Sequence, residues 1–517
     1  MTDVLARAEV ANAAPARAPR RRSGQWAAWG FLFPVVVYLV AFYAWPLYRN
    51  LDLSLHKYTV RSFVQGGAPF SGLDNYQAVV DNPTFWPALT HTVVFTGVSL
   101  LFQFSIGMAL AVFFAQNFRL SAVLRALFLV PWLLPLIVSA STWSWMMNSD
   151  SGRMATLLAG HLPAPTAGLR HHPAARAGLH PQGLRSDLDH DEGRPDRLVD
   201  HLRHLVVPAE LRESAAPVRA GRGGREPADR HGVDLRAALH PDAAEGHLMK
   251  SRVKTGVALV LTAIMLFPVY WMINVSFTRD TDMRHDPPYL FPVHGTLEGY
   301  SAVLHQQIPY LGTSFLVGLG TVALTLIISA PAGYSLAKLR PRGGGVLSFV
   351  LLMAQMIPGI IMAMGFYAIY LKLGVLNSAA GLVLADSTIA VPFGVLIFTA
   401  FMSGLPGELL NAAEIDGAGR FRTFWSVVLP VSRNAVVTVS LFAFLWAWSD
   451  FVFATTLDGG GTQQPITLGI YHYIGNNNQQ WNAIMATAVI ASIPATLLLI
   501  LAQRYVAAGV TAGAVKD

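Results

Sequence analysis

The chain has 517 residues, of which 53% are hydrophobic and only 13% are charged, with a net charge of +7 and no cysteine. Soluble domains carry about 25% charged residues, so this composition argues against a water-soluble enzyme and indicates a protein that is embedded in the lipid bilayer. Without cysteine, the chain has no disulfide framework, no cysteine-ligated zinc site and no thiol nucleophile.

The N-terminal part combines a basic tail with three apolar runs. A transmembrane helix needs about 20 mainly apolar residues, so we predict spans over residues 26–48, 91–116 and 121–147. Residues 1–25 form a tail, which Arg20 and its basic neighbours place in the cytoplasm. The first run is too long for the apolar region of a cleaved signal peptide, so we expect it to remain as a membrane anchor.

A polar segment over residues 148–248 separates this three-span part, residues 26–147, from the rest of the chain. It contains no Phe, Trp or Tyr but ten of the sixteen histidines. A segment with so little to bury is expected to be disordered. The histidines have no cysteine partners and only scattered carboxylates, so we predict no metal site, and arginines without interleaved aromatics predict no nucleic-acid site.

Residues 249–517 contain six further apolar runs. The runs cover residues 254–277, 311–336, 345–371, 379–403, 430–456 and 481–504. Lys and Arg fall mainly in alternate loops, so both ends of this part should be cytoplasmic. The predicted fold is therefore an all-α multipass bundle of about nine transmembrane helices, three plus six. The membrane topologies predicted for the two parts are incompatible. Residue 148 should lie outside the cell and Lys250 inside, yet no segment between them is able to cross the bilayer.

The two apolar parts share an internal repeat. The chain reads SGLDNYQAVV near residue 71 and GTLEGYSAVL near residue 295, which aligns Tyr76 with Tyr300, 224 positions later. A repeat this long indicates a duplicated domain. The first copy stops after its third span, where the second copy has three more. We hypothesise that residues 154–248 are translated out of frame and that Met249 begins a second protein. The alternative is a genuine basic linker.

Residues 405–430, between the last-but-two and last-but-one spans, predict two short helices separated by a bend. Glu408 lies near the positive N-terminal end of the first helix, and Gly417 supplies a bend without a Cβ penalty. The second helix repeats its apolar residues at helical spacing, and Pro430 is expected to open the next span. The segment is predicted to present a compact bracket to the cytoplasm.

This segment resembles the coupling loop, or EAA motif, of ABC importer permeases. The matching positions are Ala412, Ala413, Asp416, Gly417, Leu429 and Pro430. Asn411 stands where the family usually has Glu, and Glu408 and Glu414 lie close enough to supply part of that charge. The alternative is an ordinary pair of interfacial helices.

The resemblance extends to both apolar parts of the chain, whereas the polar segment between them matches neither permease. The sequences WAWSDFVFA from Trp446 and QPITLG from Gln464 are similar to those of the carbohydrate-uptake branch, the maltose and glycerol-3-phosphate type. Residues 249–517 resemble one complete inner-membrane permease, and the three-span part resembles the N-terminal half of its partner. The partner's own coupling loop is absent.

The resemblance implies partners and a location. Such permeases pair with a second permease subunit in the inner membrane, receive solute from an extracytoplasmic solute-binding protein and are driven by ABC ATPase subunits. The chain has no Gly-x-x-x-x-Gly-Lys-Ser/Thr phosphate loop, so ATP must be hydrolysed by a separate chain. We therefore expect neither enzyme activity nor a bound cofactor, and membrane lipid as the surroundings.

Four residues are candidates for the substrate pathway. An aspartate inside a span, such as Asp386, should face the bundle interior or a water-filled cavity. Trp446, Trp448 and Asp450 end a span, where aromatic faces suit sugar rings. The alternatives are a structural hydrogen bond for Asp386 and an interfacial belt for the tryptophans. At the level of the whole protein, the alternatives are a secondary transporter without an ATPase, a membrane enzyme that uses outer-loop carboxylates, and a defective fusion product.

Overall fold

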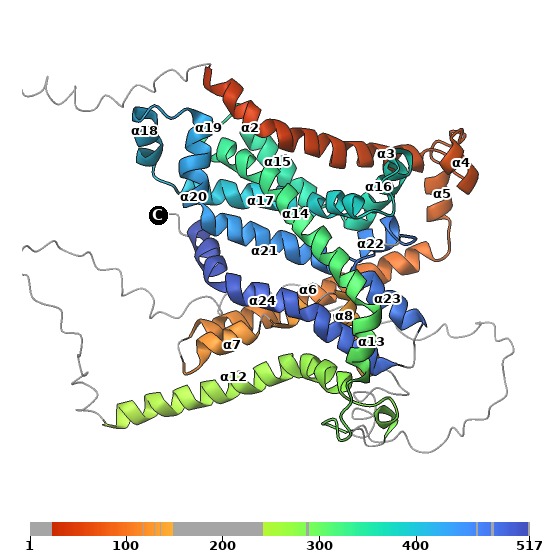
Figure 1. Cartoon of the computed structure of the whole chain (residues 1–517), viewed down its shortest axis with the longest axis vertical. Coiled ribbons are helices and arrows are strands. Elements are labelled where there is room, and N and C mark those ends of the chain that lie inside the picture. Colours follow the sequence, from red (N-terminus) through yellow and green to blue (C-terminus); the bar gives the residue numbers. More distant parts are fainter. Residues whose placement is uncertain are drawn as a thin grey trace, which may run out of the picture. The chain divides into compact units, whose positions relative to one another are not determined.

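The computed structural model describes most of the two apolar parts. The described residues are 23–116, 118–128, 130–134, 136–147, 241–285, 289–461, 464–476 and 480–514. The described residues other than 241–249 belong to one compact unit. Most of the predicted cytoplasmic tail, and the predicted disorder of the polar segment up to residue 240, lie outside the described residues. The described residues are largely helical (Figure 1), with one isolated bridge between His56 and Phe70.

The first part forms a long bent helix followed by shorter helices and a second long helix. The elements are α2 (Ser23–Leu39), η1 (Val40–Ala44), α3 (Trp45–Ser54), α4 (Val60–Gln65), α5 (Asp74–Val80), α6 (Phe85–Ala115), α7 (Ser121–Leu127), η2 (Val130–Leu133) and α8 (Leu136–Met147). The turn η1 is a π-helix that ends just before Pro46. Because Pro46 has no N–H to donate to the carbonyl of Phe42, the α-helical ladder is interrupted there.

The second part continues from the described end of the polar segment. Its elements are α12 (Pro241–Ser276), η4 (Asp282–Arg284), α13 (Glu298–Gln306), α14 (Ile308–Tyr334), η5 (Ser335–Leu339), α15 (Gly344–Gln355), α16 (Gly359–Leu373), α17 (Ala379–Ser403), α18 (Gly407–Ile415), α19 (Arg420–Thr423), η6 (Phe424–Val428), α20 (Leu429–Val431), α21 (Arg433–Ser449), α22 (Val452–Leu457), α23 (Ile466–Asn476) and α24 (Trp481–Ala514).

The described residues contain six helices that are long and apolar enough to cross a membrane, or up to eight if two bent pairs each count as one span. One bent pair is α15 with α16, which meet at 95° where Pro358 adopts an extended conformation. The described residues therefore contain up to eight of the about nine predicted spans, and the all-α multipass fold is as predicted. The run over 121–147 is not one helix but is divided into α7, η2 and α8, in a stretch where Pro131 cannot donate a backbone hydrogen bond.

The start of the next-to-last predicted span also differs from expectation. The helical segment α19–η6–α20 continues through Pro430 to Val431, and α21 begins at Arg433 after a bend of 76°. Pro430 therefore lies near the end of the bracket and does not open the span. Ser432, which follows α20, marks the bend between them.

The helices α14 and α17 form the most extensive contact of the fold. Small residues allow this approach: a Cβ on Gly320 would lie 2.7 Å from a methyl group of Val383, and one on Gly394 would lie 2.8 Å from Oγ of Ser329. Close packing of helices through small residues is typical of membrane bundles. The pair forms the centre against which α15, α16 and α21 pack.

The helix α2 belongs to the first part of the sequence but packs against the second part. The hydroxyl group of Tyr38 forms a hydrogen bond of 2.8 Å with Ser387 Oγ in α17, and Ser335 Oγ donates 2.7 Å to the carbonyl of Ala28. Leu32 is fully buried in the same apolar cluster as Val391. A helix encoded before the polar segment thus completes the core of the six-span part.

The internal repeat has a counterpart in hydrogen bonding. Ser54 at the end of α3 lies 2.7 Å from the hydroxyl of Tyr76, and Ser276 at the end of α12 lies 2.8 Å from that of Tyr300. Each serine also donates to the carbonyl three residues earlier, at 2.7 Å and 2.6 Å. The two motifs identified in the sequence therefore make the same local structure.

The two copies differ in how well their long helices are covered. The helix α14 packs against α17 and α21, and 39% of its apolar 18-residue stretch is buried within the protein. In the equivalent helix α6, only 6% of the corresponding 18-residue stretch is buried. Phe95 and Phe104 of α6, for example, are 74% and 69% exposed. Within the described residues, the first copy has no counterparts of the helices that cover α14.

Candidate functional site

The segment over residues 405–430 is a helix-turn-helix. The first helix, α18, begins after Pro406 and ends in a Schellman motif: the N–H of Ala418 donates 2.8 Å to the carbonyl of Ala413, and that of Gly417 donates 3.1 Å to Glu414. This motif requires a left-handed residue after the helix, and Gly417 has φ +77°. The sharp reversal of the chain therefore depends on glycine at this position.

Most of the predicted contact residues of α18 are accessible. Glu408, Asn411, Ala412, Glu414 and Asp416 are exposed. Only Ala413 is buried, at 6% exposure. The first helix thus presents acidic and small side chains outward, and it uses one alanine for internal packing.

The second helix of the bracket has one buried and one exposed face. Phe424 and Val428 are almost fully buried, whereas Phe421 and Trp425 are 68% and 53% exposed. The spacing of the first pair places both on one side of the helix. Leu429 is half-buried and packs on the same apolar cluster as Phe424. The bracket is therefore fixed to the bundle by its second helix.

Aromatic rings connect this second helix to two spans. Phe424 lies with its ring centroid 5.4 Å from that of Tyr334 in α14 and 5.6 Å from that of Phe31 in α2. Phe31 and Tyr334 are 5.2 Å apart in an edge-on arrangement. Aromatic pairs at these distances contribute about 0.5–1.5 kcal/mol each beyond their buried area. A displacement of the bracket would therefore be transmitted to both spans.

A lysine fixes the entry to the bracket. Nζ of Lys338 donates 2.6 Å to the carbonyl of Leu405 and 3.3 Å to that of Ser403. These carbonyls lie at and beyond the C-terminal end of α17, where a cation is favourable. Because Lys338 lies in the π-helix at the end of α14, it connects three elements: α14, α17 and the bracket.

A polar cavity of about 400 Å³ lies between the bracket and the ends of the spans. Asn411 and Glu414 of α18 line it together with Lys338 and Arg420. Gln25 from α2 closes one side, and its Oε1 accepts a hydrogen bond of 2.8 Å from the N–H of Arg342. The position where Asn replaces the usual Glu therefore borders a basic and partly enclosed site.

The four pathway candidates have different surroundings. Asp386 is buried at 3% exposure within α17. Nε1 of Trp448 donates 2.9 Å to the carbonyl of Ala491, which gives this buried ring a structural partner. The carboxylate of Asp450 accepts from the N–H groups of Phe453 and Ala454 at 3.2 Å and 2.8 Å, and thereby caps α22. Trp446 is half-buried, with its ring 5.0 Å from that of Phe393.

Three residues around the bracket were missed by the sequence reasoning. Lys338 falls in a basic loop just after a predicted span, and Tyr334 lies within that span without any pattern that marks it. Phe31 belongs to the other part of the chain. Only a contact between distant segments shows its place, and a single sequence carries no signal for such a contact.

The fold and the bracket define a multipass helical membrane protein that presents a helix-turn-helix beside its spans. Residues 329–512 match the model of the family described as binding-protein-dependent transport system inner membrane component. The chain belongs to this family of membrane transport components.

Several relatives are similar over half of this chain. It is 30% identical over 263 residues to the diacetylchitobiose uptake system permease protein DasC of Streptomyces coelicolor, covering 50% of this chain and 95% of that protein. It is 31% identical over 264 residues to the trehalose/maltose transport system permease protein MalG of Thermococcus litoralis, covering 50% and 94%. A solved bacterial ABC transporter involved in alginate import is 20% identical with a TM-score of 0.43, covering 50% of this chain and 96% of that one.

Proposed function

We propose that the chain is the permease subunit of an ATP-driven ABC importer and that it forms part of the transmembrane pathway for a sugar or sugar-like solute. Membership of the family and the uptake systems for which its relatives are named support this proposal. The single observation that carries it is the exposed helix-turn-helix over residues 405–430, anchored to two spans by its second helix.

In this proposal the bracket is the contact for the ATPase. The exposed side chains of Glu408, Asn411, Ala412, Glu414 and Asp416 meet the ATPase subunit, and the small alanine permits close approach. Gly417 sets the angle between the two helices, and Leu429 and Pro430 end the second helix beside the span. ATP is hydrolysed by that partner, and this chain binds no cofactor and performs no hydrolysis.

The motion of the ATPase would reach the pathway through the anchors of the bracket. When the ATPase pair closes, α18 and the second helix move with it, and the aromatic contacts to Tyr334 and Phe31 shift α14 and α2. The transport cycle is then a population shift between two packings of the spans. Asp386 and Trp446 are the pathway residues in this scheme, while Trp448 joins α21 to α24 and Asp450 caps α22.

The proposed location is the inner membrane with both termini in the cytoplasm. Lys338, Arg340, Arg342, Arg420 and Arg422 then lie on the cytoplasmic side, as basic loops of membrane proteins do. The solute-binding protein meets the opposite face, and the remaining surface contacts lipid.

A second permease subunit is the remaining partner. The largely exposed surface of α6, in contrast to the well-covered α14, supports the view that residues 26–147 are a truncated copy of such a subunit. The matched hydrogen bonds of Tyr76 and Tyr300 support the same duplication. We propose that a complete copy would supply the spans that cover α6, and that the polar segment replaces them because of a frameshift.

Reconstitution tests the transport proposal. The full chain, the ATPase subunits and a complete second permease are placed in proteoliposomes with the solute-binding protein, and uptake of a labelled disaccharide is measured with and without ATP. The proposal predicts uptake that requires ATP and the binding protein. Uptake driven by an ion gradient without ATP would show a secondary transporter, and product formation by the chain alone would show an enzyme.

Mass measurement tests the duplication proposal. The gene is resequenced in independent clones, and the product in cells is sized. Two open frames and a separate product that begins at Met249 would support the joined-gene explanation. An unbroken frame with a single product of 56.0 kDa would refute it and establish the polar segment as a genuine linker.

A further inference from the structure

An apolar groove of about 670 Å³ lies between α2, α14, the second helix of the bracket and the start of α21. We call it the α2 groove. Its lining includes the apolar side chains of Phe31, Pro331, Phe421 and Trp425 and the charged side chain of Arg420. Small side chains leave the space open, since a Cβ on Gly30 would meet nothing within 4 Å. The helices α2, α14 and α21 and the second helix of the bracket therefore enclose a hollow that their own side chains do not fill.

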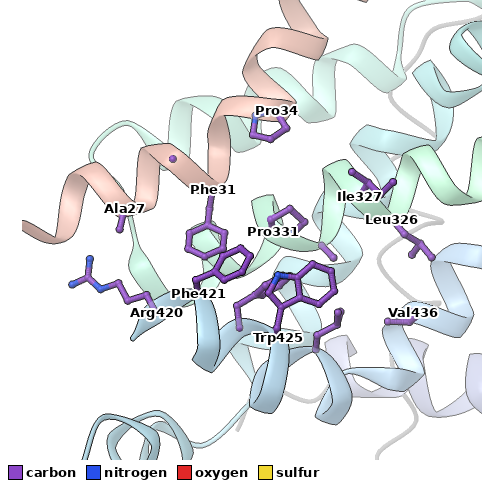
Figure 2. Close-up of a pocket in the computed structure, with 14 residues that line it drawn as sticks. Ala27, Phe31, Pro34, Leu326, Ile327, Pro331, Arg420, Phe421, Trp425 and Val436 are labelled. Atoms are coloured by element: carbon purple, nitrogen blue, oxygen red, sulfur yellow. The ribbon is translucent and has the colours of Figure 1, made fainter. Parts of the chain in front are cut away.

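The two ends of the α2 groove differ in chemistry. Figure 2 shows Arg420 at one end beside Ala27, and Leu326 and Val436 at the other, with Phe421 and Trp425 between them. Arg420 is the only charged residue that lines the groove among the described residues. The cavity thus has one cationic end and a long apolar body.

The position of the groove relative to the bilayer matches this polarity. On the orientation proposed above, Arg420 lies at the cytoplasmic ends of the spans, and the exposed Arg422 adds charge nearby. Trp425, five residues after Arg420, is 53% exposed, and tryptophan is commonly found at membrane interfaces. Basic pockets between transmembrane helices on the cytoplasmic side bind the headgroups of anionic lipids.

We propose that the α2 groove binds one anionic phospholipid, with its phosphate at Arg420 and an acyl chain along the apolar lining. The charge-assisted contact of guanidinium with phosphate fixes the headgroup, and burial of methylene groups against Phe31, Pro331 and Trp425 holds the chain. The lipid would thereby bridge α2, α14 and the second helix of the bracket. This inference uses the proposed orientation but does not require ATPase binding.

The experiment compares lipid retention by variants that fill the groove. The full chain is purified in detergent from vesicles containing equal parts of phosphatidylglycerol and phosphatidylcholine, and bound lipid is counted by native mass spectrometry. Gly30→Leu and Ala27→Leu place side chains in the groove, whereas Gly97→Leu on the exposed helix α6, where a Cβ also meets nothing within 4 Å, is the matched control.

A second pair of variants tests the headgroup contact. Arg420→Gln removes the charge at the end of the groove, and Arg422→Gln removes an exposed charge that does not line it. Loss of a hydrogen bond to a charged group should weaken retention of phosphatidylglycerol about tenfold in Arg420→Gln and leave it nearly unchanged in Arg422→Gln. Inorganic phosphate, added as a competitor, distinguishes a lipid headgroup from free phosphate.

The proposal predicts that wild type and Gly97→Leu retain phosphatidylglycerol in preference to phosphatidylcholine and that both groove-filling variants lose it. Retention by either folded groove-filling variant at the level of wild type would overturn the proposal, as would displacement of the lipid by millimolar phosphate alone. Thermal unfolding identifies any misfolded variant. If Gly30→Leu is misfolded, Ala27→Leu provides the test of the groove. Failure of wild type to bind the ATPase, with lipid retention intact, would refute the transport proposal and leave this one standing.

Discussion

The replacement Gly417→Ala tests whether the reversal in the bracket determines coupling. Gly417 has φ +77° and closes the Schellman motif at the end of α18. Nothing lies within 4 Å of a Cβ built there, so the added methyl group meets no neighbour. The effect of the substitution is therefore confined to the backbone conformation.

The magnitude follows from the left-handed conformation. For a residue with a Cβ, this conformation costs roughly 1–2 kcal/mol, so the bracket of Gly417→Ala should spend more time with α18 displaced. Because 1.4 kcal/mol is a factor of ten, we expect ATPase binding to weaken about tenfold. Gly417→Asn should weaken ATPase binding less than Gly417→Ala, since asparagine tolerates the left-handed conformation better than alanine.

Gly419→Ala is the matched control. Gly419 lies two residues later with φ −68°, which any L-residue adopts, and a Cβ there also meets nothing within 4 Å. The assay measures the dissociation constant of the purified ATPase subunit from the full chain in nanodiscs, together with ATP-dependent uptake. Thermal unfolding of each variant confirms that the spans remain folded.

The order of effects decides the outcome. We expect wild type and Gly419→Ala to have the same ATPase affinity and uptake rate. Both quantities should be intermediate in Gly417→Asn and lowest in Gly417→Ala. Equal binding and uptake in Gly417→Ala and Gly419→Ala would refute the reasoning, because the angle set by the left-handed residue would then have no role in coupling.

Three further outcomes are expected. Lys338→Met removes the donors to the Leu405 and Ser403 carbonyls, which should loosen the bracket by about 2 kcal/mol and speed proteolysis within it, whereas the exposed Lys372→Met should not. Gly394→Val places methyl groups against Ser329 and should lower stability by about 1–3 kcal/mol in thermal unfolding, whereas Gly312→Val, with nothing within 4 Å, should be nearly neutral. Burial raises the pKa of Asp458 from 3.8 to about 6, so the folded state holds its proton longer than the unfolded state and stability should fall as pH rises between these values. Asp458→Asn should flatten that decline in melting temperature, and an unchanged slope would contradict the assignment.

Several features of the fold were accessible from the sequence because they depend on local patterns. Apolar runs of sufficient length predicted most of the membrane helices, and a glycine after an amphipathic run predicted the reversal at Gly417. The repeat was visible because both copies keep the tyrosine that bonds a serine at the end of the preceding helix. The break within residues 121–147 was missed because hydropathy averages over prolines, which interrupt the backbone ladder without lowering the apolar score.

Other features depend on contacts between distant residues, which cannot be predicted from a single sequence. The packing of α2 on α17 through Tyr38 and Ser387 joins residues on opposite sides of the polar segment. The anchoring of the bracket by Phe31 has the same origin. Such contacts arise from packing and hydrogen bonding across the whole bundle, and no local period in the sequence indicates them.

The most direct test of the central claim is site-specific cross-linking, because the chain has no native cysteine. Ala412→Cys places one thiol on the exposed face of α18, and Val60→Cys, at a position 88% exposed in the first part, serves as the control. The account predicts that the purified transporter cross-links to its ATPase subunit from residue 412 and not from residue 60. An intact complex that shows no cross-link from residue 412, or an equal one from residue 60, would contradict the assignment of this bracket as the ATPase contact.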